Sequence, residues 1–241
     1  MIIKTKSHWF RMLFEWKGSV LPQLLPRLIL LFFFASSVVY FQNFFKTYNL
    51  SIDPAIFTLF GVALAIFLGF RNNVSYERWW EGRKLWGALL NDSRSIARQA
   101  HSLIASDNYE IQRTNLINTL IATVHSLRHQ LRFTNSESDL KRLLGKEACA
   151  KVSNAQFQPI MLLQMMADQI KDVKKENRIT SIEQLAFEEN FNKVSDIIGG
   201  CERIASTPIP YTYSVLLHRT VYIYCFLLPF GFVQTLGWMT P

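Results

Sequence analysis

Two histidines, His125 and His129, have a spacing that suits metal binding. They lie four residues apart, so they share one face of a predicted helix and could contact one metal ion. No acidic residue or cysteine lies nearby in sequence to complete a ligand set, and two arginines flank the pair. We interpret the histidines as a solvated or helix-packing pair and predict no metal site.

The remaining reactive residues do not form a recognisable site. The three cysteines have no ligand spacing and are predicted to be small apolar side chains: Cys149, Cys201 and Cys225. The sequence contains no P-loop, no G-x-G-x-x-G, no G-x-S-x-G and no H-E-x-x-H motif. We therefore predict that the protein is not an enzyme and needs no cofactor.

Charged residues are concentrated in the middle of the chain, and this distribution limits the class of protein. Residues 71–210 hold 19 of the 26 Lys and Arg and 16 of the 18 Asp and Glu, whereas 15 of the 19 Phe lie outside this range. A polar middle between two apolar ends excludes an ordinary soluble enzyme and a disordered chain. The net charge of +8 could indicate nucleic acid, but its excess lies mostly at the apolar ends, where membrane topology explains it. No nucleic-acid partner is predicted.

Three apolar stretches are candidate membrane spans: Leu28–Phe45, Pro54–Phe70 and Thr220–Pro241. The second could by length alone be a buried core helix, but the other two spans argue against that. Asp53 followed by Pro54 is typical of a helix start, with a capping side chain and then proline at the first helical position. Pro229 and Gly231 interrupt the third stretch.

The positive-inside rule gives the orientation. Residues 1–18 carry four basic residues and one acidic residue, so we expect a cytosolic N-terminus; the loop Tyr48–Asp53 carries no Lys or Arg and should face outward. Arg71, Arg78, Arg83 and Lys84 then return the chain to the cytosol. Tryptophans flank the spans, where an aromatic belt is expected: Trp9, Trp16, Trp79, Trp80 and Trp86.

The charged middle has helical periodicity throughout. One predicted face comprises Leu116, Leu120, Val124, Leu127 and Leu131; another comprises Phe187, Phe191, Val194 and Ile198; a third comprises Leu89, Ile96, Ala100, Leu103 and Ile104. Helix breaks are expected near residues 105–108, 134–138, 153–155 and 176–181. The fold is therefore predicted to be all-α: a multi-pass membrane protein with a cytosolic bundle of about four or five helices.

The second span carries two stripes. Val62, Ile66 and Phe70 recur every four residues, and the small residues Gly61, Ala65 and Gly69 form the neighbouring stripe, where another helix could approach closely. On the pattern alone, an ordinary lipid-facing span is favoured. The alternative is that symmetry copies of this helix surround an axis, so that the larger side chains form stacked apolar rings that gate by dewetting.

Two sequence blocks identify a family. The run from Leu68 through Arg71-Asn72-Asn73 and Tyr76-Glu77-Arg78-Trp79-Trp80-Glu81-Gly82 to Gly87 resembles the signature of the bestrophin family, especially its bacterial members. A second block agrees with it: Ile209-Pro210-Tyr211, His218-Arg219-Thr220-Val221-Tyr222 and Leu228-Pro229-Phe230-Gly231.

The resemblance implies a homopentameric ion channel in the cell membrane. Its apolar neck would correspond to Val62, Ile66 and Phe70, and a cytosolic exit constriction to Ile179, Thr180 or Ile182. We accordingly divide the chain into an N-terminal segment with two membrane helices (1–70), a cytosolic vestibule (71–208) and a C-terminal membrane segment (209–241). Family members continue with a further return span and an acidic segment, so three or four membrane segments are expected and calcium gating is unsupported.

The sign of the permeant ion is not given by an apolar neck. Five copies of Asp53 at the outer mouth would favour cations such as Na⁺ and K⁺, while Arg71, about 100° round from Phe70, would point off the axis. Chloride, which animal bestrophins pass, is the alternative. A membrane-anchored interaction or assembly protein without conductance is the alternative from another class.

Overall fold

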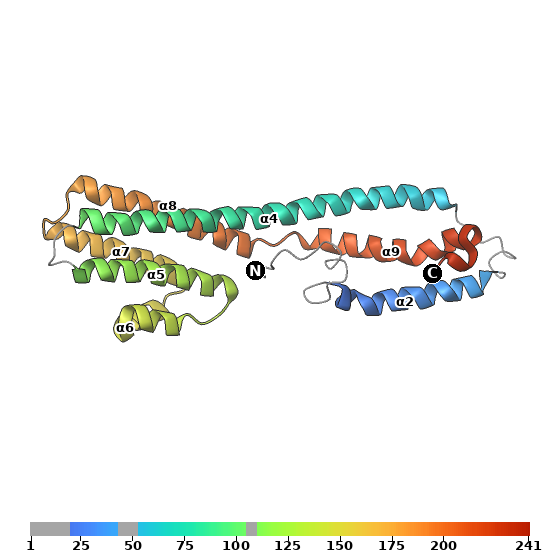
Figure 1. The fold of residues 1–241 in the computed structure, drawn as a ribbon, viewed down its shortest axis with the longest axis horizontal. Coiled ribbons are helices and arrows are strands. Elements are labelled where there is room, and N and C mark those ends of the chain that lie inside the picture. The colour runs from blue at the N-terminus through green and yellow to red at the C-terminus, as the bar shows by residue number, and fades with distance from the viewer. Residues whose placement is uncertain (1–19, 43–52, 105–109) are drawn as a thin grey trace, which may run out of the picture. The chain divides into compact units, whose positions relative to one another are not determined.

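The computed structural model describes residues 20–42, 53–104 and 110–241, and every regular element in these ranges is helical (Figure 1). The predictions for Trp9, Trp16, the basic N-terminus, residues 43–52 and the break near 105–108 lie outside the described residues. The chain forms two compact units, residues 1–72 with 210–241 and residues 73–209. Each is described by itself.

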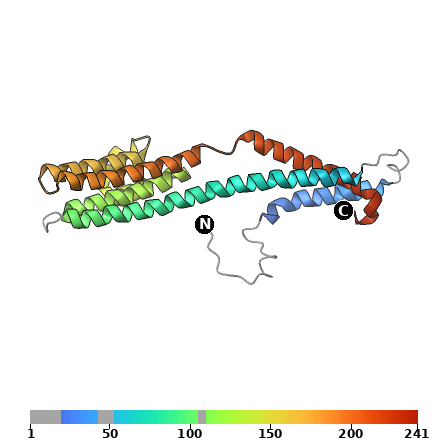
Figure 2. The same ribbon diagram turned by 90° about the horizontal axis from the view of Figure 1, so that it is seen from above.

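The first unit contains α2 (Leu21–Tyr40), the beginning of α4 (Pro54–Leu103) and α9 (Tyr211–Leu236), which continues into the short 3-10 helix η2 (Gly237–Met239). Helices α2 and α9 pack against each other: they lie next to each other in Figure 1 and converge toward the end of α9 in Figure 2. The rings of Phe34 and Phe226 stack with centroids 4.0 Å apart, and a small buried cluster joins Val38 and Val39 to Val233. Apolar packing therefore holds α2 against α9.

Helix α4 has 50 residues and begins where the sequence predicts. The backbone N–H of Ala55 donates to Asp53 Oδ1 at 2.8 Å, the bond of an N-cap residue. Near its start, α4 meets α9 closely: a β-carbon on Gly231 would lie 2.3 Å from the ring of Phe57, and one on Gly61 would lie 3.0 Å from the hydroxyl of Tyr224. Glycine at both positions thus permits this approach.

The second unit combines the rest of α4 with α5 (Glu110–Arg132), α6 (Glu137–Ser153), α7 (Gln158–Lys175) and α8 (Ser181–Ser206). Its main core draws on α4, α5, α7 and α8. The three predicted faces contribute as expected, except that Leu103, Val124 and Leu131 are only partly buried. A second cluster lies beneath α6, around Leu140 and Cys149.

Local signals end and start these helices. Phe133 and Asn177 have φ values of 53° and 57° and follow α5 and α7 as left-handed caps. Thr134 N–H then donates to His129 O at 3.0 Å, and Arg178 N–H to Val173 O at 3.3 Å. The breaks predicted at 134–138, 153–155 and 176–181 are confirmed within a few residues.

The apolar helices also confirm three segments long and apolar enough to cross a membrane: residues 21–40, 55–103 and 211–239. Two helix starts differ from prediction. Helix α9 begins at Tyr211 rather than Thr220. Helix α2 begins at Leu21 rather than Leu28, because prolines in its first turns are compatible with helix and Arg27 ends the charge-free run without ending the helix. Helix α9 passes through Pro229 without interruption.

Candidate functional site

The stripe Val62, Ile66 and Phe70 lies on the part of α4 that belongs to the first unit. These side chains are 56%, 54% and 65% exposed, so the described chain leaves more than half of each uncovered. Leu64 on the same helix is buried. An apolar stripe of this kind needs lipid or further copies of the chain as its cover.

The neighbouring stripe of small residues divides into two parts. Gly61 is approached by Tyr224 of α9, so a close helix contact exists there within one chain. Ala65 and Gly69 are exposed, and a β-carbon on Gly69 would meet no atom within 4 Å. The exposed part leaves room for a second helix beside the apolar stripe.

Asp53 is the one carboxylate on this unit's described residues. It is exposed, and it caps the N-terminus of α4 through Ala55. The capping bond holds the carboxylate at the N-terminus of α4, where its negative charge interacts favourably with the positive end of the helix dipole.

The three exit candidates have different environments. Ile179 is 5% exposed and belongs to the main core of the second unit. Thr180 caps α8: its Oγ1 accepts from Glu183 N–H at 3.2 Å, and its own N–H donates to Glu183 Oε2 at 2.7 Å. Ile182 is 81% exposed. Hydrogen bonding to the Thr180 backbone and hydroxyl lowers the pKa of Glu183, which keeps this cap ionised.

Asp139 completes the histidine pair in a way that the sequence interpretation missed. Its Oδ2 lies 2.9 Å from His125 Nδ1, 3.2 Å from His129 Nε2 and 2.9 Å from Arg128 Nη2, while Oδ1 lies 3.4 Å from Arg142 Nη2. Hydrogen bonding to His129, the charge of His125 and the bond from Arg142 hold the pKa of Asp139 at about 2. The cluster joins α6 to α5.

This arrangement is an ion-pair cluster. Two guanidinium groups occupy positions around the carboxylate where further metal ligands would be needed. Among the described residues, no group of three or more His, Cys, Asp and Glu is arranged to hold a metal ion. Cys149 and Cys201 are buried and Cys225 is partly buried, all as free thiols.

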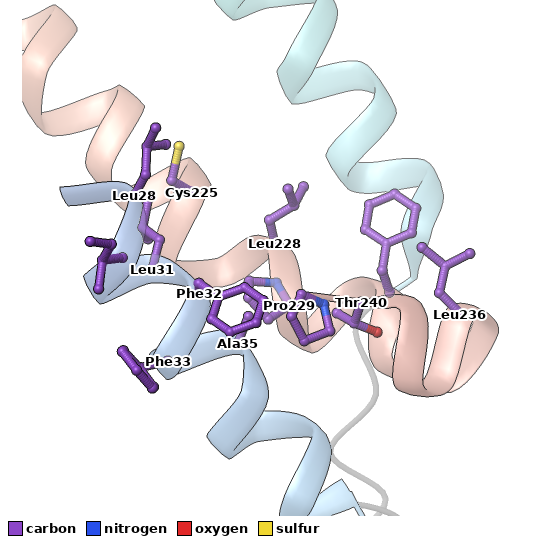
Figure 3. Close-up of a pocket in the computed structure, with 13 residues that line it drawn as sticks. Leu28, Leu31, Phe32, Phe33, Ala35, Cys225, Leu228, Pro229, Leu236 and Thr240 are labelled. Carbon is purple, nitrogen blue, oxygen red and sulfur yellow. The ribbon is translucent and has the colours of Figure 1, made fainter. Parts of the chain in front are cut away.

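A groove of about 870 Å³ lies between α2 and α9 (Figure 3). Leu28 and Leu31 line it from α2, and Cys225, Leu228 and Pro229 line it from α9. Apart from Thr240 its lining side chains are apolar, so it suits hydrocarbon or an apolar helix and offers no charged side chain to an ion. The exposed stripe of α4 is therefore the stronger candidate for a functional surface.

Comparison with known proteins gives one consistent result. The family model for bacterial and fungal bestrophin proteins matches residues 1–241. A voltage-dependent anion channel-forming protein of Ralstonia nicotianae is 45% identical over the whole chain, which covers 79% of that protein. A protein of the same description in Escherichia coli K12 is 36% identical, with 100% of this chain and 78% of the relative covered.

Solved structures agree. A variant of a bacterial bestrophin homologue from Klebsiella pneumoniae is similar with a TM-score of 0.88 and 34% identity, covering 94% of this chain and 82% of that one. Another variant of that homologue gives 0.87 and 33%, covering 91% and 81%. With a family model matched along its full length, this chain belongs to the bestrophin family.

Proposed function

We propose that the chain is one subunit of a membrane ion channel in which the first part of α4 lines the pore. Copies of α4 around a common axis would stack Val62, Ile66 and Phe70 into three apolar rings. The observation that carries the proposal is that all three side chains are exposed on one stripe of a helix apolar enough to span a membrane. Such rings form a narrow neck that conducts only when wetted.

We infer a homopentamer from the resemblance to bestrophins, with residues 71–208 on the cytosolic side of the cell membrane. The relatives' description as channel-forming proteins supports conductance. Measuring the mass of the purified protein in detergent tests the assembly. Five subunits are expected, and a monomer would rule out an axial pore.

The exit constriction of this channel is assigned to Ile182. It is the apolar candidate whose side chain is free of the subunit's own core, whereas Ile179 is buried there and Thr180 is engaged as a helix cap. Ile182→Thr should enlarge the wetted exit and raise single-channel conductance, because a hydroxyl lowers the cost of hydrating an apolar ring. Unchanged conductance would remove Ile182 from the pathway.

Two permeant ions are candidates. Exposed Asp53 at the start of the pore helix favours monovalent cations, because copies of it would form an acidic ring at the mouth. The description of the relatives as anion channel-forming proteins favours chloride as the second candidate. Reversal potentials in asymmetric NaCl distinguish them, since the potential moves toward the equilibrium potential of the ion that permeates.

Asp53→Asn isolates the charge, because asparagine caps a helix as well as aspartate does. If the acidic ring selects cations, this variant should shift the reversal potential toward that of chloride without changing stability. An unchanged potential would exclude Asp53 from selection.

Two phenylalanines of α4 test the neck itself. Phe70→Ala should make the channel leakier, because removing a ring of large side chains widens the constriction. Phe60→Ala is the matched control: Phe60 is also exposed, at 49%, but lies about 80° from Phe70 and about 120° from Ile66 around the helix. Equal effects of the two variants on current would contradict the pore assignment, and absence of current in the wild-type protein would instead favour a membrane-anchored interaction protein.

A further inference from the structure

Within the second unit, α4 and α8 run antiparallel and contact each other over a long distance. Near one end, Arg78 of α4 reaches Ile204 and Thr207 at the end of α8. Near the other end, Asn190 Nδ2 of α8 donates to Gln99 Oε1 of α4 at 2.9 Å. Residue numbers rise along one helix as they fall along the other.

Between these two points the helices approach each other closely at a glycine. A β-carbon added to Gly200 of α8 would lie 3.1 Å from both methyl carbons of Leu85 on α4. Such a separation is tighter than ordinary van der Waals contact, so the absence of a side chain at position 200 lets α8 lie directly on α4. The two helices therefore form one packed pair rather than a loose contact.

Arg78 binds the C-terminal end of α8. Its Nη2 donates to Ile204 O at 2.7 Å, and its Nη1 donates to Thr207 O. The last carbonyl groups of a helix have no partner within the helix, and the helix dipole makes that end negative. A planar guanidinium can donate to two carbonyls at once, which a lysine ammonium cannot do with the same geometry.

The Arg78 contact lies close in sequence to both points at which the chain passes between its two units. The chain passes between its two units at residues 72–73 and again at 209–210. Arg78 follows the first crossing by a few residues, and Thr207 precedes the second by a few. The Arg78 contact thus ties together the two connections through which the second unit is joined to the first.

We propose that Arg78 is a positioning residue for gating: it makes the continuation of the pore helix α4 and the whole of α8 move as one body. This inference rests on the proposed channel. Helix α8 carries Ile182 in its first turn and the Arg78 acceptors at its other end. A displacement of α4 beyond the neck is therefore passed to the exit residue through α8.

The test compares Arg78→Gln with Glu81→Gln by single-channel recording of the reconstituted protein. Glu81 forms the neighbouring exposed ion pair with Arg203, one turn along α4, and such surface pairs contribute little. We expect Arg78→Gln to change the ratio of open to closed time by about tenfold, in keeping with loss of charge-assisted hydrogen bonds, and to leave open-state conductance unchanged. Glu81→Gln should leave both unchanged. An unaltered open-to-closed ratio in Arg78→Gln would overturn the proposal.

Arg78→Lys separates geometry from charge. We expect it to behave like Arg78→Gln, because one ammonium cannot span both carbonyls; full wild-type gating in Arg78→Lys would overturn the positioning role.

Hydrogen exchange gives a readout that is independent of current. The amides of residues 204–207 should exchange faster in Arg78→Gln than in Glu81→Gln, while those in the first turn of α8 stay unchanged. A wild-type protein without current would refute the proposed channel. Unchanged hydrogen exchange of residues 204–207 in Arg78→Gln would refute the role of Arg78 at the end of α8.

Discussion

The two parts of α4 differ in where their apolar side chains find cover. In residues 73–103, Leu89, Ile96 and Ala100 are almost completely buried against α5, α7 and α8. In residues 54–72, Val62, Ile66 and Phe70 are more than half exposed. One continuous helix thus has a part whose apolar side chains are covered within the described chain and a part with an apolar stripe that the described residues leave exposed.

This difference separates folding from function along one element. The second part is built like the interior of a helical protein, in which substitutions act on stability. Apart from its contact with α9, the first part carries an apolar stripe that the described residues leave exposed, as expected of a helix that faces lipid or other copies of itself. Substitutions there should act on assembly and conductance.

Truncation of one isoleucine in each part of α4 should give the largest difference in stability. Ile96 is completely buried, so Ile96→Ala should lower the free energy of unfolding by ~2–5 kcal/mol through lost burial and a cavity. Ile66→Ala makes the same chemical change on the exposed stripe and should alter current far more than the stability of the subunit. Denaturant unfolding of the detergent-solubilised protein measures the first effect. Equal destabilisation by both variants would remove the distinction.

A smaller effect is expected from two glycines of the second unit. Gly200→Ala should stabilise the fold less than Gly82→Ala does, because its β-carbon would crowd the Leu85 side chain where α8 meets α4. Gly82→Ala is the control, since a β-carbon there meets nothing within 4 Å and alanine favours helix by ~0.5–1 kcal/mol. Thermal unfolding should therefore rank Gly82→Ala above both wild type and Gly200→Ala. The reverse order of the two variants would mean that the Leu85 side chain does not crowd position 200.

The smallest effect concerns pH and the contact of α6 with α5. The pKa of Asp139 is lowered to about 2 in the folded chain from an ordinary value of 3.8, so its ionised form stabilises the fold above pH 4. This stabilisation is lost as pH falls from about 4 to about 2. Asp139→Asn should be less stable than wild type at neutral pH, and the difference should shrink toward pH 2. A constant difference would show that the Asp139 charge plays no part.

Helix positions were predictable because their signals are local. Asp53-Pro54 marks the start of α4, and the periodic faces around Leu116 and Phe187 lie in the core as expected. The exposure of Val62, Ile66 and Phe70 agrees with the stripe, although their place around an axis stays a prediction.

Contacts between distant residues were not predictable from spacing. Asp139 lies 14 residues from His125 and on another helix, so no periodicity linked them. Arg78 and Thr207 are 129 residues apart, and nothing in a sequence near Arg78 indicates a helix end as its partner. Similarly, residues 179 and 182 are both isoleucine, and only the tertiary packing shows that Ile179 is buried and Ile182 is exposed.

The central claim is that the exposed stripe of α4 faces water in a pore. Ile66→Cys and Phe60→Cys, each reconstituted in lipid bilayers and treated with a small water-soluble thiol reagent, test it directly, with treated wild type as the control for the three native cysteines. We expect the reagent to block the current of Ile66→Cys and to leave that of Phe60→Cys and wild type unchanged. A current through Ile66→Cys that the reagent leaves unchanged would contradict the assignment of this stripe to the pore.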